Sequence, residues 1–191
     1  MDLSKQPLVV AALALGSILL GGLSAGIMLW VLPLLRPDLL ELNVTIGGLA
    51  DLLRFLLLAL IVLAMMVVLH EGLHGLMFWH FTGDRPTFGF KGLYAYAAAP
   101  SWYLPRNQHL VVALAPLLVI TLGGLLLVAL LPEAAVLPII AIVALNAGGA
   151  IGDILVALWL LRIDAAALIQ DTGDAITVFH AEDRALSGEG P

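Results

Sequence analysis

The sequence contains no cysteine and few charged residues. Without cysteine there is no disulfide framework, no thiolate metal ligand and no thiol nucleophile, so a bound metal must be held by His, Asp, Glu or backbone groups. Only 12% of the residues are charged, whereas a soluble domain usually has about 25%. The few Lys and Arg residues form no basic patch, so the sequence indicates no nucleic-acid partner.

Most residues of the chain are hydrophobic. They make up 62% of the chain, and the mean hydropathy is +1.09, which predicts an integral membrane protein with a single domain in a lipid bilayer. A helix needs about 20 residues to cross the hydrocarbon core. The apolar stretches that meet this length predict four transmembrane helices, at residues 7–35, 54–78, 108–131 and 135–161.

The first stretch is much longer than the about 7–15 apolar residues of a signal-peptide core. We therefore expect a transmembrane helix there, with a signal peptide cleaved near Leu23-Ser24-Ala25 as the alternative. The connection at 36–53 mixes charged residues with leucines, which predicts a segment lying at the membrane surface.

The loop at 79–107 has a different composition. Two short aromatic runs, 87–90 and 93–96, flank Lys91-Gly92, and this pattern predicts a β-hairpin. The expected fold class is therefore an all-α integral membrane protein with four transmembrane helices and a small β-hairpin between the second and third.

The C-terminal tail, 163–191, contains one possible strand at 175–179 and is expected to be disordered from Ser187 onward. With four spans, the N-terminus, the 79–107 loop and the tail share one side of the membrane. That side carries six of the basic residues: Lys5, Arg85, Lys91, Arg106, Arg162 and Arg184. The opposite side carries only Arg36 and Arg54, so we expect both termini in the cytoplasm of a prokaryotic cell.

The second apolar stretch contains His70-Glu71-Gly72-Leu73-His74, a His-Glu-x-x-His sequence. On a helix the two histidines lie one turn apart on one face, the spacing at which two imidazoles bind one metal ion. Ionisable groups are costly inside a bilayer, so three of them in one span predict a functional site.

Asp153 is the predicted third ligand. It is the only acidic residue in the fourth stretch, and counting residues from the helix ends places it at the depth of His70. Gly149, Ala150 and Ala157 share its helical face, and small residues allow transmembrane helices to approach closely. His80 is the alternative ligand, because His70, His74 and His80 have the metzincin spacing.

Asp153 is preferred over His80, because Met77 occupies the position at which metzincins need a helix-bending Gly. Two His and one Asp leave the fourth position of a zinc ion open for water, as in catalytic sites. The prediction is one Zn²⁺ per chain, with Glu71 as the general base for the metal-bound water. Asn146 lies on the face of Asp153 and is either an oxyanion donor or a polar clamp between helices. The remaining candidates are assigned no chemistry: His109 as an interface residue, His180 as an exposed tail residue and Glu133 as a solvated turn residue.

These motifs resemble known families. A His70-Glu71-x-x-His74 within a membrane span, then a β element and an Asp in a later span, resembles the core of the site-2 proteases. The loop with Phe88-Gly89 and Tyr94 and the later Gly152-Asp153 is more similar to the small bacterial four-helix proteins described as putative zincin peptidases. The resemblance covers about residues 50–180 and implies zinc on His70, His74 and Asp153. The site-2 proteases usually have an Asn-Pro and Asp-Gly pattern in the last core helix. The chain departs from it, because no Pro lies between Asn146 and Asp153, and Ile154 follows the Asp.

The sequence thus predicts a zinc-dependent intramembrane endopeptidase that cleaves transmembrane or membrane-proximal peptide substrates. The hairpin is expected either to pair with an extended substrate or only to close the cytoplasmic mouth. The alternative function is a non-enzymatic membrane metal-binding scaffold or transporter. Against it, the first and third spans carry almost no polar residues for a transport path. The sequence indicates neither the identity of the substrate nor the oligomeric state.

Overall fold

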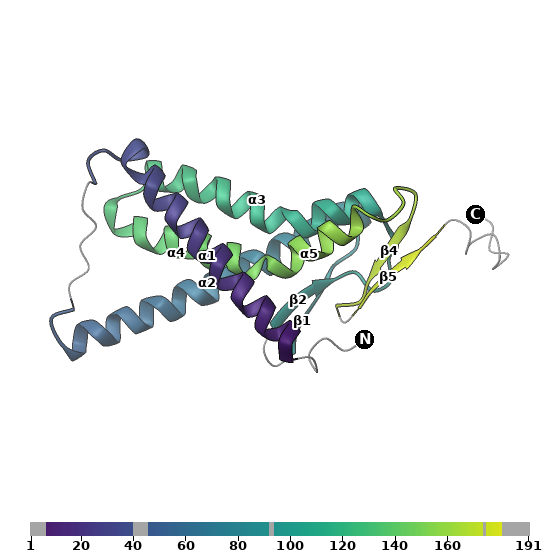
Figure 1. Cartoon of the computed structure of the whole chain (residues 1–191), viewed down its shortest axis with the longest axis horizontal. Helices are drawn as coiled ribbons and strands as arrows, with labels where there is room; N and C mark the ends of the chain where they lie inside the picture. Colours follow the sequence, from purple (N-terminus) through teal and green to yellow (C-terminus); the bar gives the residue numbers. More distant parts are fainter. Residues whose placement is uncertain (1–6, 40–45, 92–93, 174, 181–191) are drawn as a thin grey trace. The chain divides into compact units, whose positions relative to one another are not determined.

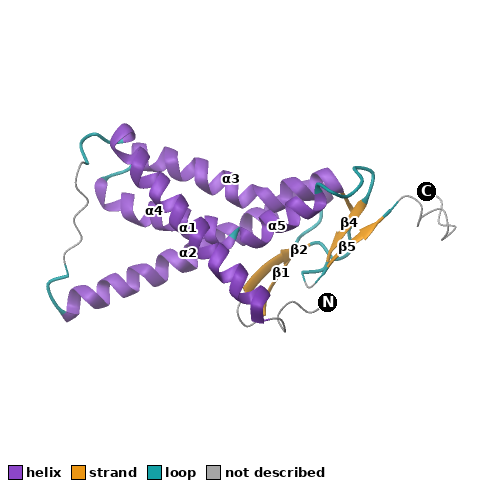
Figure 2. Cartoon of the chain, in the orientation of Figure 1, coloured by secondary structure: helices purple, strands orange, loops and turns teal. Residues whose placement is uncertain are grey.

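The computed structural model describes residues 7–39, 46–91, 94–173 and 175–180 (Figure 1). The predictions for Lys5, for the hairpin turn at Gly92 and for the tail beyond His180 lie outside these residues. The described part of the chain is mostly helical, with short antiparallel strands (Figure 2). The helices are α1 (Pro7–Leu35), α2 (Leu49–Thr82), α3 (Arg106–Leu130), α4 (Glu133–Gly149) and α5 (Ile151–Leu160). The strands are β1 (Thr87–Lys91), β2 (Tyr94–Ala98), β3 (Leu104–Pro105), β4 (Leu168–Asp171) and β5 (Ile176–Phe179).

Three of the described helices, α1, α2 and α3, are long and apolar enough to cross a membrane. Long apolar helices suit a bilayer because their backbone polar groups are all hydrogen-bonded within the segment. Taken together, α4 and α5 also meet the test, as one span that is broken and bent. The helices therefore fit a membrane protein with three spans, or four if the broken pair counts as one.

Two helix boundaries differ from the sequence prediction. Helix α2 begins at Leu49, so residues 49–53 belong to a helix and not to a surface connection. The expected continuous fourth helix is interrupted at Ala150, where ψ is 3°. Gly148 and Gly149 precede the break, and glycine is a weak helix former because it loses the most backbone entropy on folding.

The chain divides into two compact units. Unit 1 contains residues 1–69 and 117–151, and in it α1 packs against α4. The contact is close because small residues meet: a Cβ on Gly148 would lie 2.8 Å from the Ser17 carbonyl oxygen, and one on Gly21 would lie 3.0 Å from that of Ala144. Small residues are what allow such an approach between apolar helices.

Arg36 connects two helix ends within unit 1. Its guanidinium donates to the Leu131 carbonyl at 2.7 Å and forms an ion pair with Asp38 at 2.7 Å. The carbonyls of a final helical turn have no partner within the helix. The Arg36 guanidinium, just after α1, provides a hydrogen-bond donor for a carbonyl at the end of α3.

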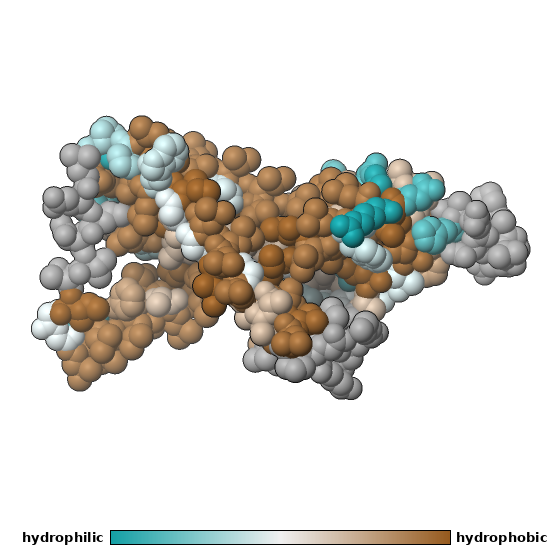
Figure 3. Space-filling view, in the orientation of Figure 1, coloured by the Kyte–Doolittle hydropathy of each residue, from teal (hydrophilic) through white to brown (hydrophobic). Residues whose placement is uncertain are grey.

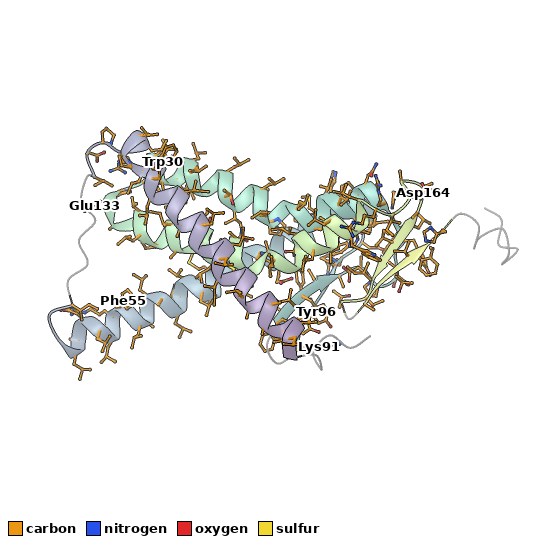
Figure 4. All side chains as sticks on the ribbon, in the orientation of Figure 1. Trp30, Phe55, Lys91, Tyr96, Glu133 and Asp164 are labelled. Atoms are coloured by element: carbon orange, nitrogen blue, oxygen red, sulfur yellow. The ribbon has the colours of Figure 1, made fainter. Side chains whose placement is uncertain are left out.

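Large hydrophobic side chains cover these helices (Figure 3). Trp30 on α1 is 74% exposed and Phe55 on α2 is 48% exposed, and both carry their rings on the outside of the unit (Figure 4). Exposed apolar area of this extent is not stable in water, and it is expected where lipid covers the protein.

Unit 2 contains residues 70–116 and 152–191. In it, β1 and β2 form an antiparallel pair, with Phe88 opposite Ala97 and Lys91 opposite Tyr94. A second antiparallel sheet, in the order β3-β4-β5, is built from the two residues just before α3 and the C-terminal segment. The sequence analysis expected one strand in this tail, near β5, and missed β3 and β4.

A small core lies at the centre of unit 2. It consists of Phe78, Ala99, Leu104 and Val112, with Met77 and Phe81 packed against it. On the hairpin, the Lys91 ammonium lies 5.7 Å from the centre of the Tyr96 ring (Figure 4). The same ring covers Gly89 of β1 and Gly173 of the β4–β5 turn, where no Cβ could fit. Tyr96 therefore joins the two sheets of this unit.

Candidate metal site

Helix α2 presents His70 and His74 on one face, one turn apart. Both are 8% exposed, and their Nε2 atoms lie 3.2 Å from each other. The ring centres are 4.8 Å apart and the rings are nearly perpendicular. The helical spacing seen in the sequence therefore places two imidazole nitrogens next to each other.

Asp153, in the first turn of α5, completes the group. Its Oδ2 lies 3.2 Å from His70 Nε2, and its Oδ1 lies 3.5 Å from His74 Nε2. Ligands of a tetrahedral zinc ion, bonded at about 2.0–2.2 Å, are about 3.3 Å from one another. The two carboxylate contacts use different oxygens; with one ligand atom taken from each residue, the three atoms lie within 4.8 Å of one another, so the group could hold a single ion.

Helix α3 fixes the orientation of His74. The Nδ1 of His74 donates a hydrogen bond of 2.9 Å to the Val112 carbonyl. In a neutral imidazole the other nitrogen, Nε2, then carries a lone pair, and this lone pair faces the Asp153 carboxylate. Metal-binding histidines commonly have such a backbone partner on the far side of the ring.

The surroundings of the Asp153 carboxylate indicate whether a metal ion fits this site. Asp153 Oδ2 is buried and makes no hydrogen bond within the described residues, although His70 Nε2 is close to it. A proton on one of the two imidazoles would provide a donor for only one of the three contacts among these acceptor atoms. A cation placed between His70, His74 and Asp153 would interact favourably with all three side chains. Two His and one Asp with a fourth position open are ligands that suit zinc. The group therefore could hold a metal ion.

Glu71 lies beside the candidate ligands, directly after His70, and is half-buried. The backbone of Ala97 in β2 interacts with its carboxylate. The hairpin thus contacts the residue between the two histidines. Sequence analysis gave no sign of this contact, because the two residues belong to different elements.

Two other sequence candidates lie elsewhere. His80 is exposed on α2, with its ring 5.1 Å from that of Phe81, and among the described residues it is not part of the metal-ligand group. Asn146 is fully buried in α4, in unit 1. Its part in catalysis stays a prediction.

His109, predicted to be an interface residue without a chemical role, is buried and faces a carboxylate. It is 2% exposed, inside unit 2, and its Nε2 lies 3.7 Å from Asp171 Oδ2 at the end of β4. Sequence analysis did not single out Asp171. The only local signal was the turn that Gly173 suggests, and a turn gives no hint of a partner on α3.

Fold and site together define a helical protein, with spans suited to a membrane, that carries a candidate His-His-Asp metal site. The chain belongs to the family described as putative zincin peptidase, whose family model matches residues 63–168. Membership of this family indicates metallopeptidase activity and implies zinc as the metal. No curated protein and no solved structure matches the chain.

Proposed function

We propose that the protein is a zinc-dependent intramembrane endopeptidase that cleaves peptide bonds of membrane-embedded or membrane-proximal substrates. The observation that carries the proposal is the meeting of His70, His74 and Asp153 within 3.5 Å of one another, with Glu71 next to them. His70, His74 and Asp153 would hold one zinc ion per chain. The arrangement also resembles the core of the site-2 proteases.

Bound zinc supplies two effects: it lowers the pKa of a water molecule and polarises a carbonyl group. Glu71 would accept the proton released as water attacks the peptide carbonyl, and would then give it to the leaving amine. The backbone of Ala97, which interacts with the Glu71 carboxylate, would help to hold it in place for both transfers. The Val112 carbonyl would keep His74 in the tautomer whose Nε2 can bind metal.

A substrate must be extended at the bond that is cleaved. Within the described residues β1 pairs only with β2, so the hairpin has free edges, and a free edge can bind an extended peptide as an added strand. Phe88 and Phe90 of β1 are 57% and 71% exposed. We propose that the hairpin aligns the substrate next to Glu71.

Asn146 has two proposed roles. A side-chain amide can donate to the substrate carbonyl as negative charge develops on its oxygen. The same amide can instead join two helices as a buried polar contact. Asn146→Ala would lower the cleavage rate without unfolding the protein in the first case and would mainly lower the melting temperature in the second.

The test of the function is Glu71→Gln. This variant keeps the shape of the side chain but cannot accept a proton, so cleavage of a transmembrane substrate should fall by about 10²–10⁴-fold. Zinc content, measured by mass spectrometry on the purified protein, should stay near one ion per chain.

His70→Ala is the matched variant, and it should lose zinc as well as activity. Full activity of Glu71→Gln would overturn the mechanism. Readily exchanging zinc together with a silent Glu71→Gln would support a non-enzymatic metal-binding scaffold or transporter.

A further inference from the structure

One buried side chain of unit 2 has no part in the proposed chemistry. The ring of His109, in the first turn of α3, lies 5.9 Å from that of Phe78. Its Nδ1 is buried and has no hydrogen-bond partner among the described residues. Leaving a buried polar atom unsatisfied costs about 1–3 kcal/mol. A leucine could fill this space without that cost, so the imidazole calls for an explanation.

His109 lies next to the contact that orients the metal ligand His74. His109 and Val112 are three residues apart on α3 and therefore share one face. The Val112 carbonyl accepts the hydrogen bond from His74. The ring that His109 touches, Phe78, follows His74 by one turn of α2. The first turns of α3 thus meet α2 at the orienting carbonyl and again at His109.

Asp171 is itself held in place. Its Oδ1 accepts a 2.7 Å hydrogen bond from the N–H of Gly173, which leaves Oδ2 towards His109. The carboxylate interacts electrostatically with His74, and burial raises its pKa. A buried carboxylate is favourable only when partners compensate its charge. Among the described residues, His109 Nε2 lies 3.7 Å from Oδ2, a separation longer than a direct hydrogen bond, so the imidazole faces the carboxylate.

The strand that carries Asp171 is also joined to α3 through the backbone. In the β3–β4 pair, Pro105 lies opposite Leu168, and the N–H of Arg106 donates to the Ala167 carbonyl at 3.1 Å. Because α3 begins at Arg106, the residue before β4 contacts the first turn of this helix through the backbone, and Asp171 at the end of β4 faces His109 in the same turn.

We propose that His109 and Asp171 are positioning residues for the metal ligand His74. The pair fixes the first turn of α3, and so holds the Val112 carbonyl where it orients the imidazole of His74. The inference rests on the proposed metal site. It adds to that site a residue that lies beyond position 168, where the family match ends.

The test is the zinc affinity of the purified full-length chain, measured by competition with a chelator, and the visible spectrum of the Co²⁺-substituted protein. His109→Leu should weaken zinc binding about tenfold and change the Co²⁺ spectrum, because an altered partner of a metal ligand changes its position. His109→Gln should restore most of the affinity, since its amide N–H can replace the Nε2–H towards Asp171. Asp171→Asn should weaken binding less than His109→Leu, and the double variant should be no weaker than His109→Leu alone, because the two residues act as a unit.

His80→Leu is the matched control, since it removes an exposed histidine from α2, and it should leave zinc affinity unchanged. If His109→Leu lowers the melting temperature but keeps the wild-type zinc affinity and Co²⁺ spectrum, then His109 has only a packing role. That result would overturn the proposal. If His109→Leu does not fold, the nearly isosteric Asp171→Asn decides, and wild-type affinity and spectrum in that variant overturn the proposal. If the wild-type protein binds no zinc, both the proposed function and the positioning role of His109 and Asp171 are overturned. If the wild-type protein binds zinc and no variant changes the affinity, only the positioning role is overturned.

Discussion

At the scale of single residues, Gly75 shows how closely the hairpin fits against α2. Gly75 follows His74 directly, and a Cβ there would overlap the ring of Phe88 and approach Pro86 to 3.3 Å. The Phe88 ring thus lies against the backbone of the ligand-bearing turn. Gly72 lies one turn earlier on the same helix and has open space around it.

The two glycines therefore give a matched pair of substitutions. Ala is a better helix former than Gly by about 1 kcal/mol, so Gly72→Ala should stabilise the protein slightly. Gly75→Ala should destabilise it by about 1–3 kcal/mol, because Phe88 must move. Thermal unfolding in detergent checks both, and equal melting temperatures would show that the hairpin does not pack on Gly75.

The candidate ligand residues differ in how far local sequence predicts them. His70 and His74 are related by the period of one helix, so their proximity follows from sequence spacing alone. Asp153 was inferred by matching depths along two helices, and the structure places it 3.2 Å from His70 Nε2. The Val112 carbonyl has no side-chain signature and could not have been inferred.

At the scale of elements, one tight contact of small residues lies outside the helical face that the sequence singles out. That analysis assigned close approach to the helical face of Gly149, Ala150 and Ala157. In unit 1 the tight contact joins α1 and α4 at Gly148 and Gly21, whereas Gly149 has nothing within 4 Å of its Cβ position. The neighbouring glycines therefore have different roles, although their residue type is the same.

Gly148→Val and Gly149→Val separate these roles. Both place a β-branched residue in the last turn of α4, so their intrinsic costs to the helix are similar. Gly148→Val should lower stability by about 1–3 kcal/mol more than Gly149→Val, because it forces α1 away from α4. Thermal unfolding in detergent provides the comparison, and similar melting temperatures would contradict the packing of α1 on α4.

The second sheet shows what element-scale patterns miss. The strands β3 and β4 are two and four residues long, too short for an alternating pattern to stand out from a loop. They form because Leu104 and Ile169 come together from distant parts of the chain. Pairing of this kind depends on tertiary proximity more than on intrinsic strand preference.

At the scale of the whole molecule, the absence of cysteine makes the proposed topology directly testable. Any single cysteine introduced into this chain is the only thiol in it. Ser101, in the loop between β2 and α3, and Gly48, just before α2, are both exposed. The excess of Lys and Arg predicts the first position on the cytoplasmic side and the second on the opposite side.

In intact cells, a membrane-impermeant maleimide should therefore label Gly48→Cys and leave Ser101→Cys unlabelled until the cells are lysed. The two variants serve as controls for each other, because each should react fully after lysis. The reverse pattern would invert the topology. Labelling of both positions from the outside would show that α2 does not cross the membrane.

The sequence by itself determined the class of protein, the long apolar helices and the His70–His74 pair, since composition and helical period act locally along the chain. It also limited the candidates for a third ligand to Asp153 and His80, because few ionisable residues occur within apolar stretches. Only the tertiary structure decided that Asp153 meets the two histidines while His80 lies apart, that Phe88 fills the space at Gly75, and that Asp171 faces His109. Such contacts join segments far apart in the sequence, and their geometry depends on how whole elements pack.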